Sequence, residues 1–124
     1  GSTVYDDTYN ANPQSVAAAI DFLAQFPGET IMILGDMAEL GENSIALHTE
    51  MGKRAREHGI SKLYTFGPLS KNASAAFGEN SLHFSAKQDL ITHLQQESRP
   101  EQVILIKASR SMQLEEVVAA LTEE

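Results

Sequence analysis

Two runs of the sequence are apolar at almost every position, and they limit the folds that the chain can adopt. Residues 30–34 read TIMIL and residues 102–106 read QVILI. A strand with one face in water alternates apolar and polar residues, whereas a strand covered on both faces is apolar throughout. Such strands occur in parallel sheets that have helices packed on both sides. The two runs therefore predict buried strands in an α/β protein.

The segments around these runs fit the same fold class. Further strands are predicted at residues 3–6, 62–66 and 81–84, the last of them at an edge of the sheet. Apolar residues at helical spacing predict helices over residues 13–26 and after residue 111. Further helices are predicted over residues 44–58, 70–76 and 85–96. A chain of 124 residues is too short for an eight-stranded barrel of about 250 residues. We therefore expect an open, doubly wound and mostly parallel sheet with helices on both faces.

The expected helix starts depend on polar residues that can cap a first turn. Asn12 precedes a proline, which suits the first position of a helix. Ser44 and Ser111 are expected to cap their helices, and Ser85 is expected to form a capping box with Gln88.

Composition excludes several classes of function. The chain has no cysteine and a formal net charge of −8 at pH 7, so disulfide frameworks, thiolate metal sites and nucleic-acid binding are not expected. No apolar run approaches the ~20 residues that cross a bilayer, and no signal peptide is visible. These features are compatible with a cytoplasmic protein that has no membrane partner. Gly1 and Ser2 resemble the remnant of an expression tag, and residues 3–124 are expected to be one domain of a longer protein.

Three of the predicted strands are followed by dense polar loops. These loops are DDTYNAN at residues 6–12, GDMAELGE at residues 35–42 and KASRS at residues 107–111. In open α/β sheets, ligands bind beyond the carboxyl ends of the strands. If the three strands are neighbours, the loops form one rim, and this convergence predicts a binding site.

Individual residues in these loops have more than one interpretation. Asn12 is a helix cap, whereas Asn10 is either a turn residue or a ligand contact. Asp36 could bind a metal, although a loop aspartate more often accepts hydrogen bonds from the backbone. Lys107 leaves a buried strand and Arg110 precedes a helix, so both could meet an anion. His48 lies within a predicted helix, where a histidine more often bonds a nearby backbone group or carboxylate than a metal. The other three histidines share no metal-ligand spacing, and no metal site is predicted.

Several nucleotide and catalytic motifs are absent from the sequence. There is no G-x-x-x-x-G-K-[ST] phosphate loop, no G-x-G-x-x-G after the first strand and no serine-nucleophile elbow. We therefore do not expect the domain to hold a nucleotide triphosphate alone.

The three loops together resemble those of a known family. DDTYNANPQSV, GDMAELGENSIALH and KASRSMQLEEVV are similar to segments of the C-terminal domain of the Mur ligases. YNANP and GDM-x-E-L-G are most similar to the branch that adds D-alanyl-D-alanine. The sequence departs from the family at Ala108, where glycine is usual; if that backbone needs a positive φ, alanine would cost about 1 kcal/mol.

The resemblance implies a Rossmann-like third domain of an ATP-dependent ligase, whose N-terminal and central ATPase domains are missing here. It implies ATP and Mg, bound mainly by the central domain, with D-alanyl-D-alanine and UDP-N-acetylmuramoyl-tripeptide as substrates joined through an acyl phosphate. The full enzyme is expected to be a monomer in the bacterial cytoplasm, and this domain is expected to be inactive alone, with no catalytic residue of its own. The residues expected to contact nucleotide or substrate are Tyr9, Asn10, Asn12, Pro13, Asp36, Lys107, Ser109 and Arg110.

Two other classes remain open at this point. A phosphoacceptor receiver domain is also a doubly wound fold of ~120 residues. Such domains carry an acidic pair after the first strand, an aspartate after a later strand and a lysine after the last. The corresponding residues here would be Asp6 and Asp7, Asp36, and Lys107. Against this reading, Asp36 follows the second predicted strand rather than the third, and YNANP has no role there. A Rossmann-like module recruited only for protein contacts is the third possibility.

Overall fold

The computed structural model describes residues 3–8 and 10–122. Its core is one sheet of five strands in the order β1-β5-β2-β3-β4, and every neighbouring pair is parallel. The strands are β1 (Thr3–Asp7), β2 (Thr30–Gly35), β3 (Lys62–Phe66), β4 (Ser81–Phe84) and β5 (Val103–Lys107). The parallel sheet is confirmed, and so is the position of β4 at its edge.

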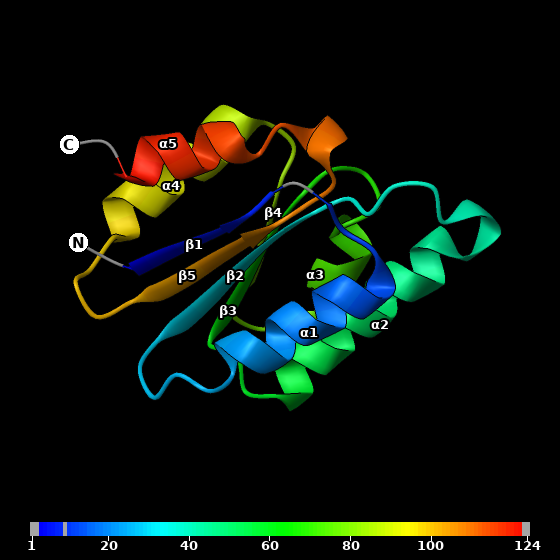
Figure 1. Ribbon diagram of the computed structural model, residues 1–124, viewed down its shortest axis with the longest axis horizontal. Coiled ribbons are helices and arrows are strands. Elements are labelled where there is room, and N and C mark those ends of the chain that lie inside the picture. The colour runs from blue at the N-terminus through cyan, green and yellow to red at the C-terminus, as the bar shows by residue number, and fades with distance from the viewer. Residues whose placement is uncertain (1–2, 9, 123–124) are drawn as a thin grey trace.

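Helices cover both faces of the sheet (Figure 1). The helices are α1 (Pro13–Leu23), α2 (Ser44–Glu57), α3 (Lys71–Phe77), α4 (Lys87–Glu97) and α5 (Glu115–Thr122), with 3₁₀ turns at Gly41–Asn43 (η1) and Arg110–Met112 (η2). α1, α2 and α3 lie on one face, and α4 and α5 lie on the other. This arrangement confirms the doubly wound α/β fold.

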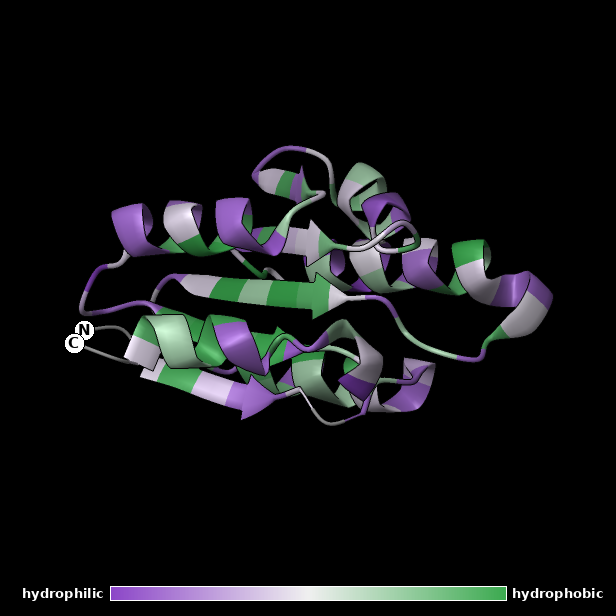
Figure 2. Ribbon diagram, turned by 90° about the horizontal axis from the view of Figure 1, so that it is seen from above, coloured by the Kyte–Doolittle hydropathy of each residue, from purple (hydrophilic) through white to green (hydrophobic). Residues whose placement is uncertain are grey.

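The central strand β2 explains why its sequence is apolar throughout. All six of its residues are buried, and Figure 2 shows it as a hydrophobic strand in the middle of the sheet. Successive side chains of a strand point to opposite faces. Met32 and Leu34 accordingly pack in the cluster with α1–α3, whereas Ile31 and Ile33 pack in the cluster with α4 and α5.

One of the predicted helix caps is confirmed. The Asn12 side chain accepts a hydrogen bond from the backbone N–H of Ser15 at 2.8 Å, and the Ser15 hydroxyl oxygen accepts one from the Asn12 N–H at 3.0 Å. This reciprocal capping box satisfies two donors at the start of α1. The helix ends at Leu23 rather than at residue 26, because the N–H groups of Gln25 and Phe26 turn back to the carbonyls of Phe22 and Leu23.

Three other predicted caps are wrong. Ser44 is the first residue of α2 rather than its cap, because η1 precedes the helix and the Ser44 hydroxyl donates to the Gly41 carbonyl. α4 is capped by the extended residue Ala86 without any side-chain cap bond, so Ser85 forms no capping box. Ser111 lies within η2, because the chain makes a 3₁₀ turn and a left-handed residue before α5 begins.

The strand order also decides between the α/β folds left open by the sequence. In the flavodoxin-like order 2-1-3-4-5, which receiver domains share, the first strand lies inside the sheet. Here β1 is at the edge, and β5 separates it from β2. The receiver interpretation is therefore wrong.

Candidate functional site at the carboxyl edge of the sheet

The loops after β1, β2 and β5 meet at one edge of the sheet, as the sequence predicts. Asp7 is paired with Lys107 across the β1–β5 ladder, and Lys107 is paired with Leu34 across the β5–β2 ladder. Because all three strands are parallel, their carboxyl ends reach the same edge together. Residues separated by as many as 100 positions in sequence thus become direct neighbours.

The Lys107 ammonium is bonded within the protein. Its Nζ atom lies 2.8 Å from Asp7 Oδ2, and the exposed fractions of the two side chains are 4% and 48%. A buried cation needs a partner, because its desolvation is otherwise costly. An approaching ligand would therefore meet a neutralised pair, in which the reachable group is the Asp7 carboxylate.

Asp7 was missed among the site residues predicted from the sequence, although its loop was identified. A signal was available: a lysine at the end of a buried strand requires a carboxylate, and parallel neighbours supply one from the equivalent position. The deciding fact is the pairing of β1 with β5, and the sequence alone does not give it.

The loop after β1 begins with local hydrogen bonds between Asp6 and Thr8. The Asp6 carboxylate accepts hydrogen bonds from the Thr8 N–H at 3.1 Å and from its hydroxyl at 2.8 Å. Asn10 is exposed and Asn12 caps α1, with Pro13 as the first helical residue. Tyr9 lies outside the described residues.

Asp36 is bonded to the backbone of the β3–α3 loop. Its carboxylate is buried, and Oδ1 accepts the Ser70 N–H at 2.7 Å and both oxygens lie within 3.2 Å of the Leu69 nitrogen. Its own carbonyl accepts the Ser109 N–H at 3.3 Å. Of the two readings left open by the sequence, the geometry matches a backbone-bonded loop aspartate.

Two histidines near this edge are also bonded within the protein. The fully buried His48 accepts the Met37 N–H at Nε2, 2.9 Å away, and its Nδ1 donates to the Ser44 carbonyl, 2.6 Å away. His83 Nδ1 lies 2.7 Å from the Thr65 hydroxyl, and burial lowers the pKa of this ring. Both histidines therefore act as structural hydrogen-bonding groups.

The last loop carries the remaining predicted residues. Ser109 is nearly buried, and its hydroxyl lies 3.0 Å from that of Ser111. Arg110 is exposed and lines a cleft of about 450 Å³ together with Asp6, Asp7, Thr8 and Glu115. A second cleft, of about 430 Å³, begins at the same Asp7–Lys107 pair and runs along α1 past Tyr5, Ala18 and Phe22.

Alanine fits at position 108 without strain. Among the described residues other than glycine, positive φ occurs at Glu39, Asn80 and Gln113, so Ala108 does not have the left-handed backbone that favours glycine. Its side chain is buried and faces Gly35, where an added Cβ would lie 2.7 Å from that of Ala108. The departure from the family pattern therefore leaves the loop conformation accessible.

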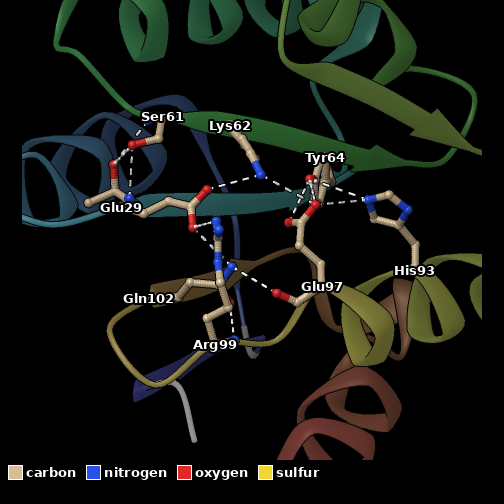
Figure 3. A network of polar contacts seen from close by, with 9 residues as sticks. Glu29, Ser61, Lys62, Tyr64, His93, Glu97, Arg99 and Gln102 are labelled. Carbon is tan, nitrogen blue, oxygen red and sulfur yellow. Dashed lines mark hydrogen bonds and ion pairs between the residues drawn. The ribbon is translucent and has the colours of Figure 1, made fainter.

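A third cavity lies at the opposite end of the sheet and has a different character. Its volume is about 610 Å³, and Glu29, Lys62, Arg99 and Gln102 line it. Figure 3 shows that these side chains bond to one another and, through Lys62, to Glu97. These hydrogen bonds and ion pairs link the amino ends of β2, β3 and β5. Because the side chains already bond to one another, we interpret the cavity as structural rather than as a ligand site.

The pKa of Glu29 reflects this network. Burial of its carboxylate alone would raise the pKa, but hydrogen bonds from Lys62, Gln102 and Arg99 outweigh that effect and lower it to about 2. Over residues 3–8 and 10–122, no group of three or more acidic, histidine or cysteine side chains could hold a metal ion. In the same part of the chain, no helix is both long and apolar enough to span a bilayer.

Known proteins are similar to this chain in sequence and in fold. Residues 1–110 match the family described as Mur ligase, glutamate ligase domain. The UDP-N-acetylmuramoyl-tripeptide–D-alanyl-D-alanine ligase of Escherichia coli K12 is 45% identical over 120 residues, which are 95% of this chain and 26% of the ligase. The ligase of the same name from Bacillus subtilis is 34% identical over 130 residues, 99% of this chain and 28% of its own length.

Solved structures agree with these sequence matches. The crystal structure of the MurF ligase from Thermotoga maritima in complex with ADP superposes with a TM-score of 0.83 at 30% identity, over 94% of this chain and 27% of that one. A MurF structure from Acinetobacter baumannii gives a TM-score of 0.85 at 28% identity, over 100% of this chain and 29% of that one. The chain thus spans between a quarter and a third of the length of the relatives it matches.

Proposed function

Because this chain belongs to the Mur ligase family, we propose that it is the C-terminal domain of a UDP-N-acetylmuramoyl-tripeptide–D-alanyl-D-alanine ligase. The full enzyme uses ATP to phosphorylate the terminal carboxylate of the UDP-linked tripeptide. The amine of D-alanyl-D-alanine attacks the acyl phosphate, and the tetrahedral intermediate collapses to an amide with release of ADP and phosphate. The enzyme works as a monomer in the bacterial cytoplasm.

The observation that carries this proposal is the convergence of the three loops at one edge of the sheet. These loops carry the sequence motifs that resemble the family, and because they meet at one edge they can contact the same ligand. The exposed Asn10 both donates and accepts hydrogen bonds, so it can contact adenosine or a peptide group without adding charge. Arg110, which lines the cleft beside Asp7, supplies positive charge for the dipeptide carboxylate or for phosphate.

The chain's own residues fit a supporting role in ATP binding. The sequence has no phosphate loop, and its described part contains no cluster of metal ligands. We therefore assign the triphosphate and Mg²⁺ to the central domain. The C-terminal domain closes over the central domain and positions the dipeptide. Closure also excludes water, which would otherwise hydrolyse the acyl phosphate.

The substitution Asn10→Ala in the full-length enzyme tests this function. We expect the KM for ATP or for the dipeptide to rise about tenfold, the effect of losing one hydrogen bond worth about 1.4 kcal/mol. Initial rates of phosphate release, measured with each substrate varied in turn, give both constants. Gln96→Ala, which removes an exposed amide of α4, is the control. Unchanged kinetics for Asn10→Ala would contradict the role of this loop.

A further inference from the structure

Asp36 is hydrogen-bonded to two other loops at the carboxyl edge of the sheet. Its backbone carbonyl accepts the Ser109 N–H at 3.3 Å, and Ser109 belongs to the last polar loop. Its carboxylate accepts the N–H groups of Leu69 and Ser70 in the β3–α3 loop. With an exposed fraction of 6%, the Asp36 residue has little surface left for a ligand.

The space around this carboxylate is closed on the side of Gly67. Gly67 has a φ of +112°, and a Cβ added there would lie 2.4 Å from Asp36 Oδ1. Any side chain at this position must displace the carboxylate. On the other side, the next residue, Met37, donates its N–H to the buried His48. Asp36 and Met37 are thereby fixed from the β3–α3 loop and from α2 at the same time.

We propose that Asp36 is a positioning residue, which holds the loop of Ser109 and Arg110 in its binding conformation and does not itself contact nucleotide or dipeptide. This role differs from the direct contact predicted from the sequence. It rests on the proposed ligase function for its kinetic consequences, but its structural part stands without it. Gly67 and His48 contribute to the same role. Gly67 leaves room for the Asp36 carboxylate, and His48 holds the next residue, Met37, by a hydrogen bond.

Gly67→Ala in the full-length enzyme tests the proposal without altering any group that a ligand could touch. Gly59→Ala is the matched control, because Gly59 also has a positive φ, of +82°, but an added Cβ meets nothing within 4 Å. Asp36→Asn is the second variant; it keeps one acceptor oxygen but presents an amide donor to the backbone N–H groups. Hydrogen exchange of the Ser109 amide and the KM for each substrate are measured in all three.

We expect both Gly67→Ala and Asp36→Asn to speed Ser109 exchange about tenfold relative to Gly59→Ala, as the loss of one hydrogen bond predicts. The KM for ATP or dipeptide should rise with it, while kcat changes less. The proposal is overturned if Gly67→Ala exchanges and binds like Gly59→Ala while Asp36→Asn alone raises KM, because Asp36 would then contact a ligand directly. If the wild-type enzyme forms no amide, the ligase function fails, but the exchange rates still decide the role of Asp36.

Discussion

At the scale of single residues, the carboxyl edge of the sheet contains an ion pair within the protein, between Lys107 and Asp7. Lys107 is almost fully buried against the half-exposed Asp7. A buried ammonium without a partner would pay a large desolvation penalty, so this pair is needed for the fold as well as for a site. Two clefts reach Asp7, one along α1 that Lys107 also lines and one on the side of α5, so a ligand has access to this carboxylate from both sides.

The pair can be tested by removing one partner at a time. Asp7→Ala should lower the free energy of unfolding by about 1–3 kcal/mol, because Lys107 stays buried without its carboxylate. Lys107→Met should cost less, because methionine fills the same space and leaves only an exposed carboxylate. Urea unfolding at constant pH measures both values. Glu50→Ala, an exposed position on α2, should change stability by less than about 0.5 kcal/mol. Equal losses for all three variants would show that the pair contributes nothing specific.

At the scale of elements, the amino ends of β2 and β3 and the end of α4 are held by ion pairs. Glu29 bonds to Lys62 and Arg99, and Lys62 also reaches Glu97. The folded pKa of Glu29 is about 2, below its ordinary value of 4.5. A lowered carboxylate pKa contributes stability above the unfolded pKa, and this contribution is lost as pH falls through the folded one.

Glu29→Gln should therefore weaken the fold in a pH-dependent way. At pH 7 we expect the variant to be about 2 kcal/mol less stable, as for the loss of hydrogen bonds to a charged group. The difference from wild type should shrink as pH falls from 4.5 towards 2, because wild-type Glu29 then becomes protonated. Thermal unfolding across this range measures the difference, with Glu101→Gln, at an exposed position, as the control. A difference that is constant with pH would mean that the Glu29 charge has no part in the effect.

The boundaries of the helices could be predicted only in part. Asn12 was predictable as a cap because the proline after it fixes where α1 starts. Ser44, Ser85 and Ser111 have the same chemistry but lie inside or beside 3₁₀ turns and extended residues. A hydroxyl can bond to several nearby backbone groups, so its type alone does not say which residue begins the helix.

At the scale of the whole molecule, the pattern of apolar residues predicted the α/β class. The polar loops predicted the edge of the sheet at which the candidate site lies. The strand order was beyond reach, because β1 pairs with β5, the strand most distant from it in sequence. This pairing depends on how the helices distribute between the two faces, and no local pattern encodes it. The partner of Lys107 and the tie between Asp36 and Ser109 are consequences of that order, so sequence reasoning identified their loops but not their contacts.

The same arrangement limits what the domain can do alone. Binding a triphosphate requires several converging backbone N–H groups or cations, whereas this chain has a net charge of −8 and no phosphate loop, and Lys107 is paired with Asp7. We expect the isolated chain to form no amide bond and to bind ATP more weakly than about 1 mM, a binding free energy of about −4 kcal/mol. Isothermal calorimetry with MgATP measures this affinity, and titration of Mg²⁺ alone is the control. Micromolar affinity would place the nucleotide site on this domain and overturn the assignment of the triphosphate to the central one.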